Sequence, residues 1–117
     1  MKLYRFGPDA ARHITNFGSD FGMSMVFRGD GPLQGGCMHI GAGGLVGYHQ
    51  TTVPQLFLVT AGEGWVRGEG PERTPIRSGT AAFWVGGEWH EAGSETGMTA
   101  IVIEGEGIDL APFMPEV

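Results

Sequence analysis

Two histidines far apart in the chain carry most of the chemistry that this sequence offers. His49 lies in the stretch GYHQTTVPQLFLVTAGEG, residues 47–64, two residues before Thr51 and six before Gln55. His90 follows in the stretch GGEWHEAGS, residues 86–94. Neutral imidazole is a common metal ligand, and it also serves as a hydrogen-bonded group in a core. The two histidines therefore indicate either a shared metal site or packed strands.

Other kinds of reactive group are missing from the sequence. It contains no glycine-rich phosphate loop, no nucleophile elbow and no pair of catalytic carboxylates. Glu63, Glu88 and Glu91 lie in or beside predicted turns, where we expect solvated side chains. The single cysteine, Cys37, has no partner for an internal disulfide or a two-cysteine redox motif, and we expect it to be a small buried apolar residue.

Length and charge narrow the class of protein. A chain of 117 residues fits one domain with a core of its own. The formal net charge of -6 and the pI near 5.0 argue against nucleic acid or an anionic membrane as a partner, because phosphate contacts need clustered Lys and Arg. The sequence shows neither a signal peptide nor an apolar run of membrane-spanning length. These features predict a soluble, cytoplasmic protein in a reducing compartment.

The elements that must position the histidines are predicted to be short strands. Glycine supplies 22 of the 117 residues, without a triplet period, and separates short apolar segments. This pattern predicts an all-β sandwich or barrel whose strands fall at 22–28, 36–40, 55–61, 64–68, 74–77, 80–85 and 98–105.

Two further features concern the faces of these strands and the ends of the chain. Segments 55–59 and 100–104 are apolar on nearly every residue, which predicts that a second sheet or a second subunit covers their outer faces. Residues 8–17 have weak helical character, and we expect the tail 107–117 to form an extended arm on the barrel or on a second subunit.

The spacings around the two histidines resemble the two consensus motifs of the cupin superfamily. In the first motif five residues separate Gly43 from His49, and in the second five separate Gly79 from Val85. The other matched positions are Thr51, Gln55 and Gly62 in the first motif, and Gly87, His90 and Ser94 in the second. The resemblance covers about residues 36–104. It implies an all-β, cupin-type double-stranded β-helix (jelly-roll) barrel, a single domain over 1–117 with N-terminal and C-terminal arms.

The resemblance also implies a metal site. Cupins usually bind one divalent ion through three histidines and a glutamate, and here His49 and His90 match ligand histidines, Gln55 stands at the glutamate position and Thr51 at that of another histidine. The implied metal ligands are His49, Gln55 and His90, and the implied cofactor is a divalent zinc, nickel, iron, copper or manganese ion. A threonine hydroxyl is a poor substitute for imidazole, and an amide brings no charge, so we expect weaker binding than in the usual set.

Ordinary structural roles stay open for these residues. Gln55 is either a ligand or a buried amide that satisfies backbone groups, and strand packing explains Thr51 without a metal. Because His49 and Thr51 are two residues apart, we expect their side chains to share one face of a strand. The candidate pocket-lining residues are Thr51, His39, Trp84 and Trp89.

Three kinds of function fit these expectations. The first is an enzyme, a metal-dependent oxidoreductase, isomerase or lyase acting on a small organic acid. Neutral ligands leave the cation its full charge, so this site would favour an anionic ligand. The second is a metal-free barrel that binds or senses a small molecule, and the third is a structural homodimer. The expected partners are a small-molecule ligand and a second copy of the chain, without nucleic acid or membrane.

Overall fold

The computed structural model describes residues 4–5, 8–28, 31, 33–108, 110 and 114–117. Nearly all regular structure in this part of the chain is antiparallel β-strand, as the glycine-punctuated sequence predicts. The elements are η1 (Pro8–Ala10), β1 (Arg12–Ile14), η2 (Asn16–Gly18), β2 (Phe21–Arg28), β3 (Gln34–Ile40), β4 (Leu45–Gln50), β5 (Gln55–Arg67), β6 (Thr74–Arg77), β7 (Ala81–Trp84), β8 (Trp89–Gly93) and β9 (Met98–Glu104).

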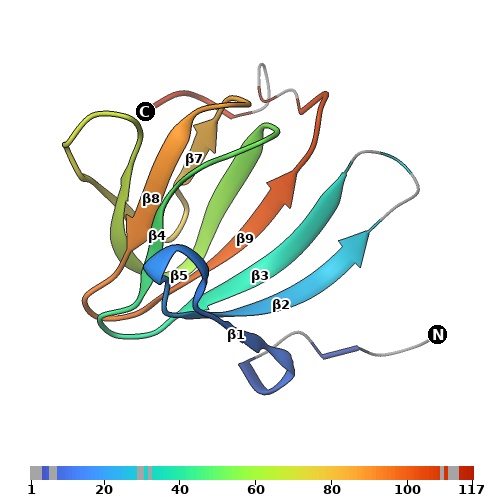
Figure 1. Ribbon diagram of the computed structural model, residues 1–117, viewed down its shortest axis with the longest axis vertical. Coiled ribbons are helices and arrows are strands. Elements are labelled where there is room, and N and C mark those ends of the chain that lie inside the picture. Colours follow the sequence, from blue (N-terminus) through green and yellow to red (C-terminus); the bar gives the residue numbers. More distant parts are fainter. Residues whose placement is uncertain (1–3, 6–7, 29–30, 32, 109, 111–113) are drawn as a thin grey trace.

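The long strand β5 joins two halves of one curled sheet (Figure 1). Its first half, from Gln55, pairs with β9 and β7, and its second half, up to Arg67, pairs with β8 and β6. The order β1-β2-β3-β9-β5-β8-β4 runs through this strand from one edge to the other. A β-bulge between Val59 and Ala61 interrupts the pairing of β5 with β9, which continues to Gly62, just before the pairing with β6 begins at Glu63.

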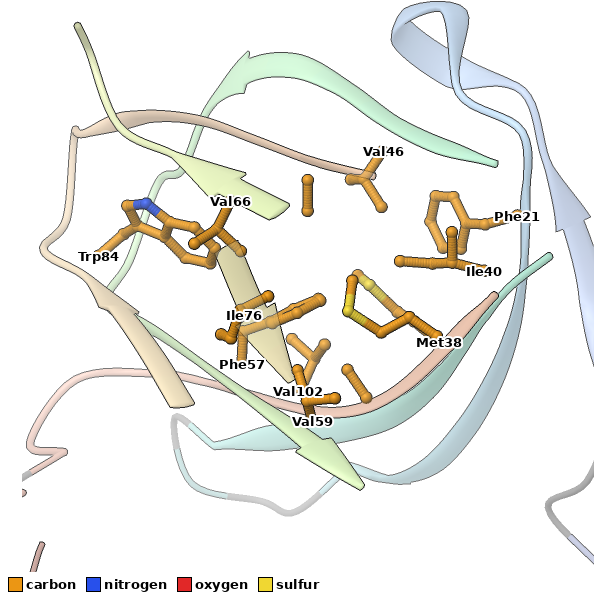
Figure 2. Packing of buried hydrophobic residues seen from close by; sticks show 13 residues of the cluster. Phe21, Met38, Ile40, Val46, Phe57, Val59, Val66, Ile76, Trp84 and Val102 are labelled. Atoms are coloured by element: carbon orange, nitrogen blue, oxygen red, sulfur yellow. The ribbon is translucent and has the colours of Figure 1, made fainter. Parts of the chain in front are cut away.

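The two halves of the sheet enclose an apolar core. Figure 2 shows core side chains from both halves pointing into the space between them. In β9, Met98, Ala100 and Val102 face this core, while the alternate residues Ile101 and Ile103 face outward. Packing against this core therefore explains the apolar residues on one face of β5 and β9, the two strands that are apolar on both faces.

Within this single chain, some side chains on the outer face of the sheet are already buried. Cys37 lies on β3 between core-facing neighbours and points outward, yet it is 0% exposed, and Leu56 on the outer face of β5 is 7% exposed. Burial raises the pKa of the Cys37 thiol, which agrees with the expected role as a buried apolar residue.

The sequence-based assignment of strands differs from the structure at three places. Residues 8–17 contain the short helical turn η1, the strand β1 and the start of η2 rather than one helix. Segments 55–61 and 64–68 form the single strand β5, apart from Gly68. The strands β4 and β8, which carry both histidines, were not among the predicted segments.

At the ends of the chain, fewer of the sequence-based expectations can be compared with the structure. Residues 109 and 111–113 of the tail lie outside the described residues, so the expectation of an extended C-terminal arm stays untested. No helix in the described part of the chain is long and apolar enough to cross a membrane.

Candidate functional site

A β-bulge in β4 turns His49 toward the interior. Val46 pairs with Ala92 and His49 pairs with His90, so three steps along β4 match two steps along β8. In a regular strand His49 would face away from the side to which Val46 points, because side chains alternate. The extra residue reverses the alternation and places His49 directly opposite His90.

Gly47 lies in this bulge and is tightly covered by η2. A Cβ added to Gly47 would overlap the carbonyl oxygen of Phe17, so only glycine fits at this approach. The Gly47 N–H donates to Ser19 Oγ at 3.0 Å. Phe17 has a φ of 60°, rare for a bulky residue, and its ring stacks on the His49 ring at a centroid distance of 4.8 Å. The turn η2 therefore contributes to holding the His49 ring.

The two imidazoles meet through their Nε2 atoms, which are 3.2 Å apart. His49 Nδ1 lies 2.7 Å from the Gly47 carbonyl oxygen, and since a carbonyl only accepts, this nitrogen carries the hydrogen. Neutral His49 therefore has a free lone pair on Nε2, and His90 Nε2–H donates to it. Such a backbone contact also orients metal-binding histidines.

His90 is the more buried member of the pair, with 3% of its surface exposed. Its Nδ1 atom is buried and has no hydrogen-bond partner among the described residues. Burial, followed by repulsion from a charge on His49, lowers the pKa of His90 to about 4. The His90 ring is therefore neutral at neutral pH.

A small cavity of about 20 Å³ adjoins the histidine pair. This volume holds about one water molecule or one metal ion. Its lining is mainly apolar and comprises Met38, Val46, His49, Gln55, Phe57, Trp84, His90, Glu91 and Ala92.

Gln55 belongs to a row of three polar side chains that cross the sheet. Gln34, Glu104 and Gln55 are direct neighbours on β3, β9 and β5. The Gln55 Nε2 donates to Glu104 Oε1 at 2.6 Å, and the Gln34 Nε2 donates to Glu104 Oε2 at 2.9 Å. A carboxylate only accepts, so the Gln55 amide nitrogen faces Glu104 and its oxygen faces the other way. Sequence reasoning missed Glu104, whose only signal was an acid ending an apolar strand.

The structure separates the other predicted site residues into two groups. Trp84 lines the cavity, and its ring packs edge to face against the His90 ring, with 4.4 Å between the ring centroids. Thr51, His39 and Trp89 are not among the cavity-lining residues.

Each of the three has a different environment. Thr51 lies beyond the end of β4, where its hydroxyl donates to the Val53 carbonyl at 2.6 Å, so the expectation that it shares a strand face with His49 was wrong. His39 points to the outer face of β3, 3.1 Å from Ser24 Oγ. Trp89 is 40% exposed and stacks on Tyr48 outside the barrel.

Glu91 also differs from expectation. It lies within β8 rather than in a turn, and its carboxylate pairs with Arg67 Nε at 2.6 Å, with only 12% of its side chain exposed. Because this ion pair occupies the carboxylate, Glu91 is not a free acid beside the cavity.

The spacing of the two imidazole nitrogens is compatible with one shared divalent metal ion, provided that the His90 hydrogen lies on Nδ1 instead of Nε2. Ligands about 2.1 Å from one tetrahedral ion are about 3.4 Å apart, which is close to the observed 3.2 Å between the imidazole nitrogens. Gln55 would supply the third protein donor. No cluster of three His, Cys, Asp or Glu side chains suited to a metal occurs within the described ranges, so a metal here would have only two imidazoles and an amide as candidate protein donors.

Comparisons with known proteins establish the fold. A predicted oxalate decarboxylase from Thermotoga maritima has 19% sequence identity and a TM-score of 0.74, covering 86% of this chain and 96% of its own. A Cupin 2 conserved barrel domain protein from Salinispora arenicola has 13% identity and a TM-score of 0.71, covering 92% and 90%. An RmlC-like cupin family protein with a double-stranded β-helix fold, from Methanocaldococcus jannaschii, has 13% identity and a TM-score of 0.70, covering 90% of each chain.

The chain therefore has the cupin fold, an all-β double-stranded β-helix, and the resemblance of the two motifs to cupins is confirmed at the level of the fold. No family model matches the sequence, and no curated protein matches it either.

Proposed function

We propose that this cupin-fold protein binds one divalent metal ion through His49, His90 and Gln55, with a small anionic organic ligand beside it. The observation that carries the proposal is the approach of His49 Nε2 to His90 Nε2, 3.2 Å apart, at a cavity that Gln55 also lines. The lowered pKa of His90 supports it, because a metal needs neutral imidazole.

The nature of the organic ligand follows from charge and volume. Three neutral donors leave the cation its full charge, which favours a carboxylate or an enolate as the remaining ligand. The Thermotoga maritima protein of similar fold, a predicted oxalate decarboxylase, supports the same class of ligand. A cavity of about 20 Å³ has no room for an organic acid as well as an ion, so the acid needs space outside this cavity or a shift of the side chains that line it.

Metal binding is tested on protein prepared without an affinity tag. We expect metal analysis to find a bound divalent ion, and titration calorimetry of chelator-treated protein to show one site for zinc or nickel. His49→Ala and His90→Ala should each weaken binding at least about a hundredfold, or about 2.8 kcal/mol, because one imidazole remains. His13→Ala removes an exposed histidine that pairs with Asp20 and serves as the control. Wild-type protein that binds neither metal would contradict the proposal.

A metal-free small-molecule binder is the alternative function. The direct hydrogen bond between the two imidazoles favours it, since each ring already has a partner without any metal. In that case His49→Ala and His90→Ala would change the binding of small organic acids to chelator-treated protein, and zinc or nickel would bind to no variant.

We also propose that the protein forms a homodimer as a single cupin domain. Support comes from the outer face of β5, β7 and β9, where Leu58, Ile101 and Ile103 are half-buried and Phe83 is 37% exposed. A second copy is the occupant expected for an apolar face of this kind.

A further inference from the structure

The proposed metal site lacks a carboxylate among its ligands, but a carboxylate lies directly behind one of them. Glu104 accepts a hydrogen bond of 2.6 Å from the Gln55 amide. The strand register places both residues opposite each other on β9 and β5, on the face that also carries the core residues Phe57 and Val102. Glu104 is thus an interior-facing acid near the end of the core.

The hydrogen bonding of Glu104 fixes the direction of the Gln55 amide. Gln34 occupies the second carboxylate oxygen at 2.9 Å, so both oxygens of Glu104 have an amide partner. With its nitrogen on Glu104, Gln55 cannot flip without losing a charge-assisted hydrogen bond. Gln55 is 5% exposed, and flipping would bring its oxygen against a carboxylate oxygen.

The same contact changes the donor strength of the amide. An amide whose N–H donates to an anion is polarised, and negative charge accumulates on its oxygen. The negative charge of Glu104 also acts on a cation held at that oxygen, since Gln55 is buried and Glu104 is partly buried. Glu104 thereby compensates in part for the absence of a carboxylate ligand at position 55.

We propose that Glu104 is the positioning residue of the metal site, which directs the Gln55 oxygen toward the cavity and supplies the negative charge that the ligands lack. This inference rests on the proposed metal binding by His49, His90 and Gln55. Gln34 completes the arrangement by holding the other oxygen of the same carboxylate.

Glu104→Gln tests the role of this charge, because it keeps the side-chain size and an acceptor oxygen for Gln55. Calorimetric titration of chelator-treated protein with zinc and nickel should show binding at least about tenfold weaker than in wild type, or about 1.4 kcal/mol. Glu106→Gln is the matched control, since it removes the same charge two residues away at an exposed position and should leave the affinity unchanged.

Exchanging the two side chains gives a second, independent test. Gln55→Glu alone places two carboxylates in contact, which should lower the melting temperature. The double variant Gln55→Glu with Glu104→Gln restores one carboxylate and one amide with the charge now at the ligand position. It should melt near wild type and bind metal at least about tenfold more tightly than wild type.

The outcomes separate this inference from the proposed metal site. If His49→Ala abolishes binding while Glu104→Gln binds like wild type, the metal site stands and the role of Glu104 is overturned. If Glu104→Gln fails to fold, the double variant decides, and one that melts near wild type without tighter binding shows that the pair is only structural. Wild-type protein without metal affinity overturns both proposals.

Discussion

At the scale of single residues, the unusual group is the buried nitrogen of His90. The Gly47 carbonyl fixes the hydrogen of His49 on Nδ1, and His90 Nε2–H then donates to His49 Nε2. This leaves His90 Nδ1 as a buried acceptor with no partner in the described part of the chain. A buried acceptor without a partner costs about 1–3 kcal/mol of folding free energy.

The lowered pKa of His90 predicts that metal-free protein loses stability in mild acid. The unfolded chain binds a proton at His90 near the ordinary pKa of 6.5, whereas the folded chain does so only near 4. Neutral His90 therefore contributes stability that is fully present above pH 6.5 and is lost as the pH falls toward 4. The total contribution is about 3 kcal/mol.

Chemical denaturation across this pH range, with a chelator present, measures the effect. His90→Gln provides the comparison, because carboxylates that titrate in the same range are common to both proteins. The difference in unfolding free energy between wild type and His90→Gln should shrink as the pH falls from 6.5 to 4. Parallel curves for the two proteins would show that His90 titrates normally in the folded state.

At the scale of elements, the bulge in β4 decides whether the histidines meet. Gly47 makes three contacts at this point. The Phe17 carbonyl approaches it closely, its N–H donates a hydrogen bond to Ser19, and its carbonyl accepts a hydrogen bond from His49. Gly47→Ala should lower the unfolding free energy by about 2–3 kcal/mol, because the Cβ requires the backbone of η2 or β4 to move.

The same substitution should also weaken zinc or nickel binding, since the displaced carbonyl no longer holds His49. Denaturation curves and calorimetry measure the two effects. Gly70→Ala is the control, because a Cβ at Gly70 meets open space, and it should change stability by less than about 0.5 kcal/mol. A Gly47→Ala protein as stable as wild type would contradict this account of the bulge.

Much of this fold could be predicted from the sequence, whereas the site could be predicted only in part. Glycines and β-branched segments indicate most of the strands, and β6 at Thr74–Arg77 agrees with its predicted bounds. The strands β4 and β8 were not predicted from the sequence, because His49, Gln50 and His90 interrupt their apolar pattern. The histidines were identified from motif spacing, which does not depend on that pattern.

The partners of the candidate ligands depend on register, which local sequence does not specify. Gln55 and Glu104 are 49 residues apart and meet because β5 and β9 pair in one particular alignment. Thr51 was placed on a strand face because the end of β4 was not known. A one-residue bulge and a strand end are therefore the details that separate the predicted site from the observed one.

At the scale of the whole molecule, the apolar outer face of the sheet bears on the proposed dimer. Leu56 pairs with Ile103 and with Phe83 across the sheet, and Leu58 pairs with Ile101, so these side chains form adjacent rows on β9, β5 and β7. The chain itself buries Leu56, but it leaves Phe83 exposed. This partial coverage is the physical reason to expect a second copy on this face.

Sedimentation of wild-type protein at tens of micromolar should therefore show a dimer. Ile103→Lys places a charge in the apolar rows and should shift the protein to a monomer, because a buried unpaired charge is costly. Thr74→Lys adds the same charge at an exposed position on β6, in the other half of the sheet, and should leave the dimer intact. A strict monomer in the wild type would contradict the dimer, while a dimer that persists in Ile103→Lys would place the contact on another face.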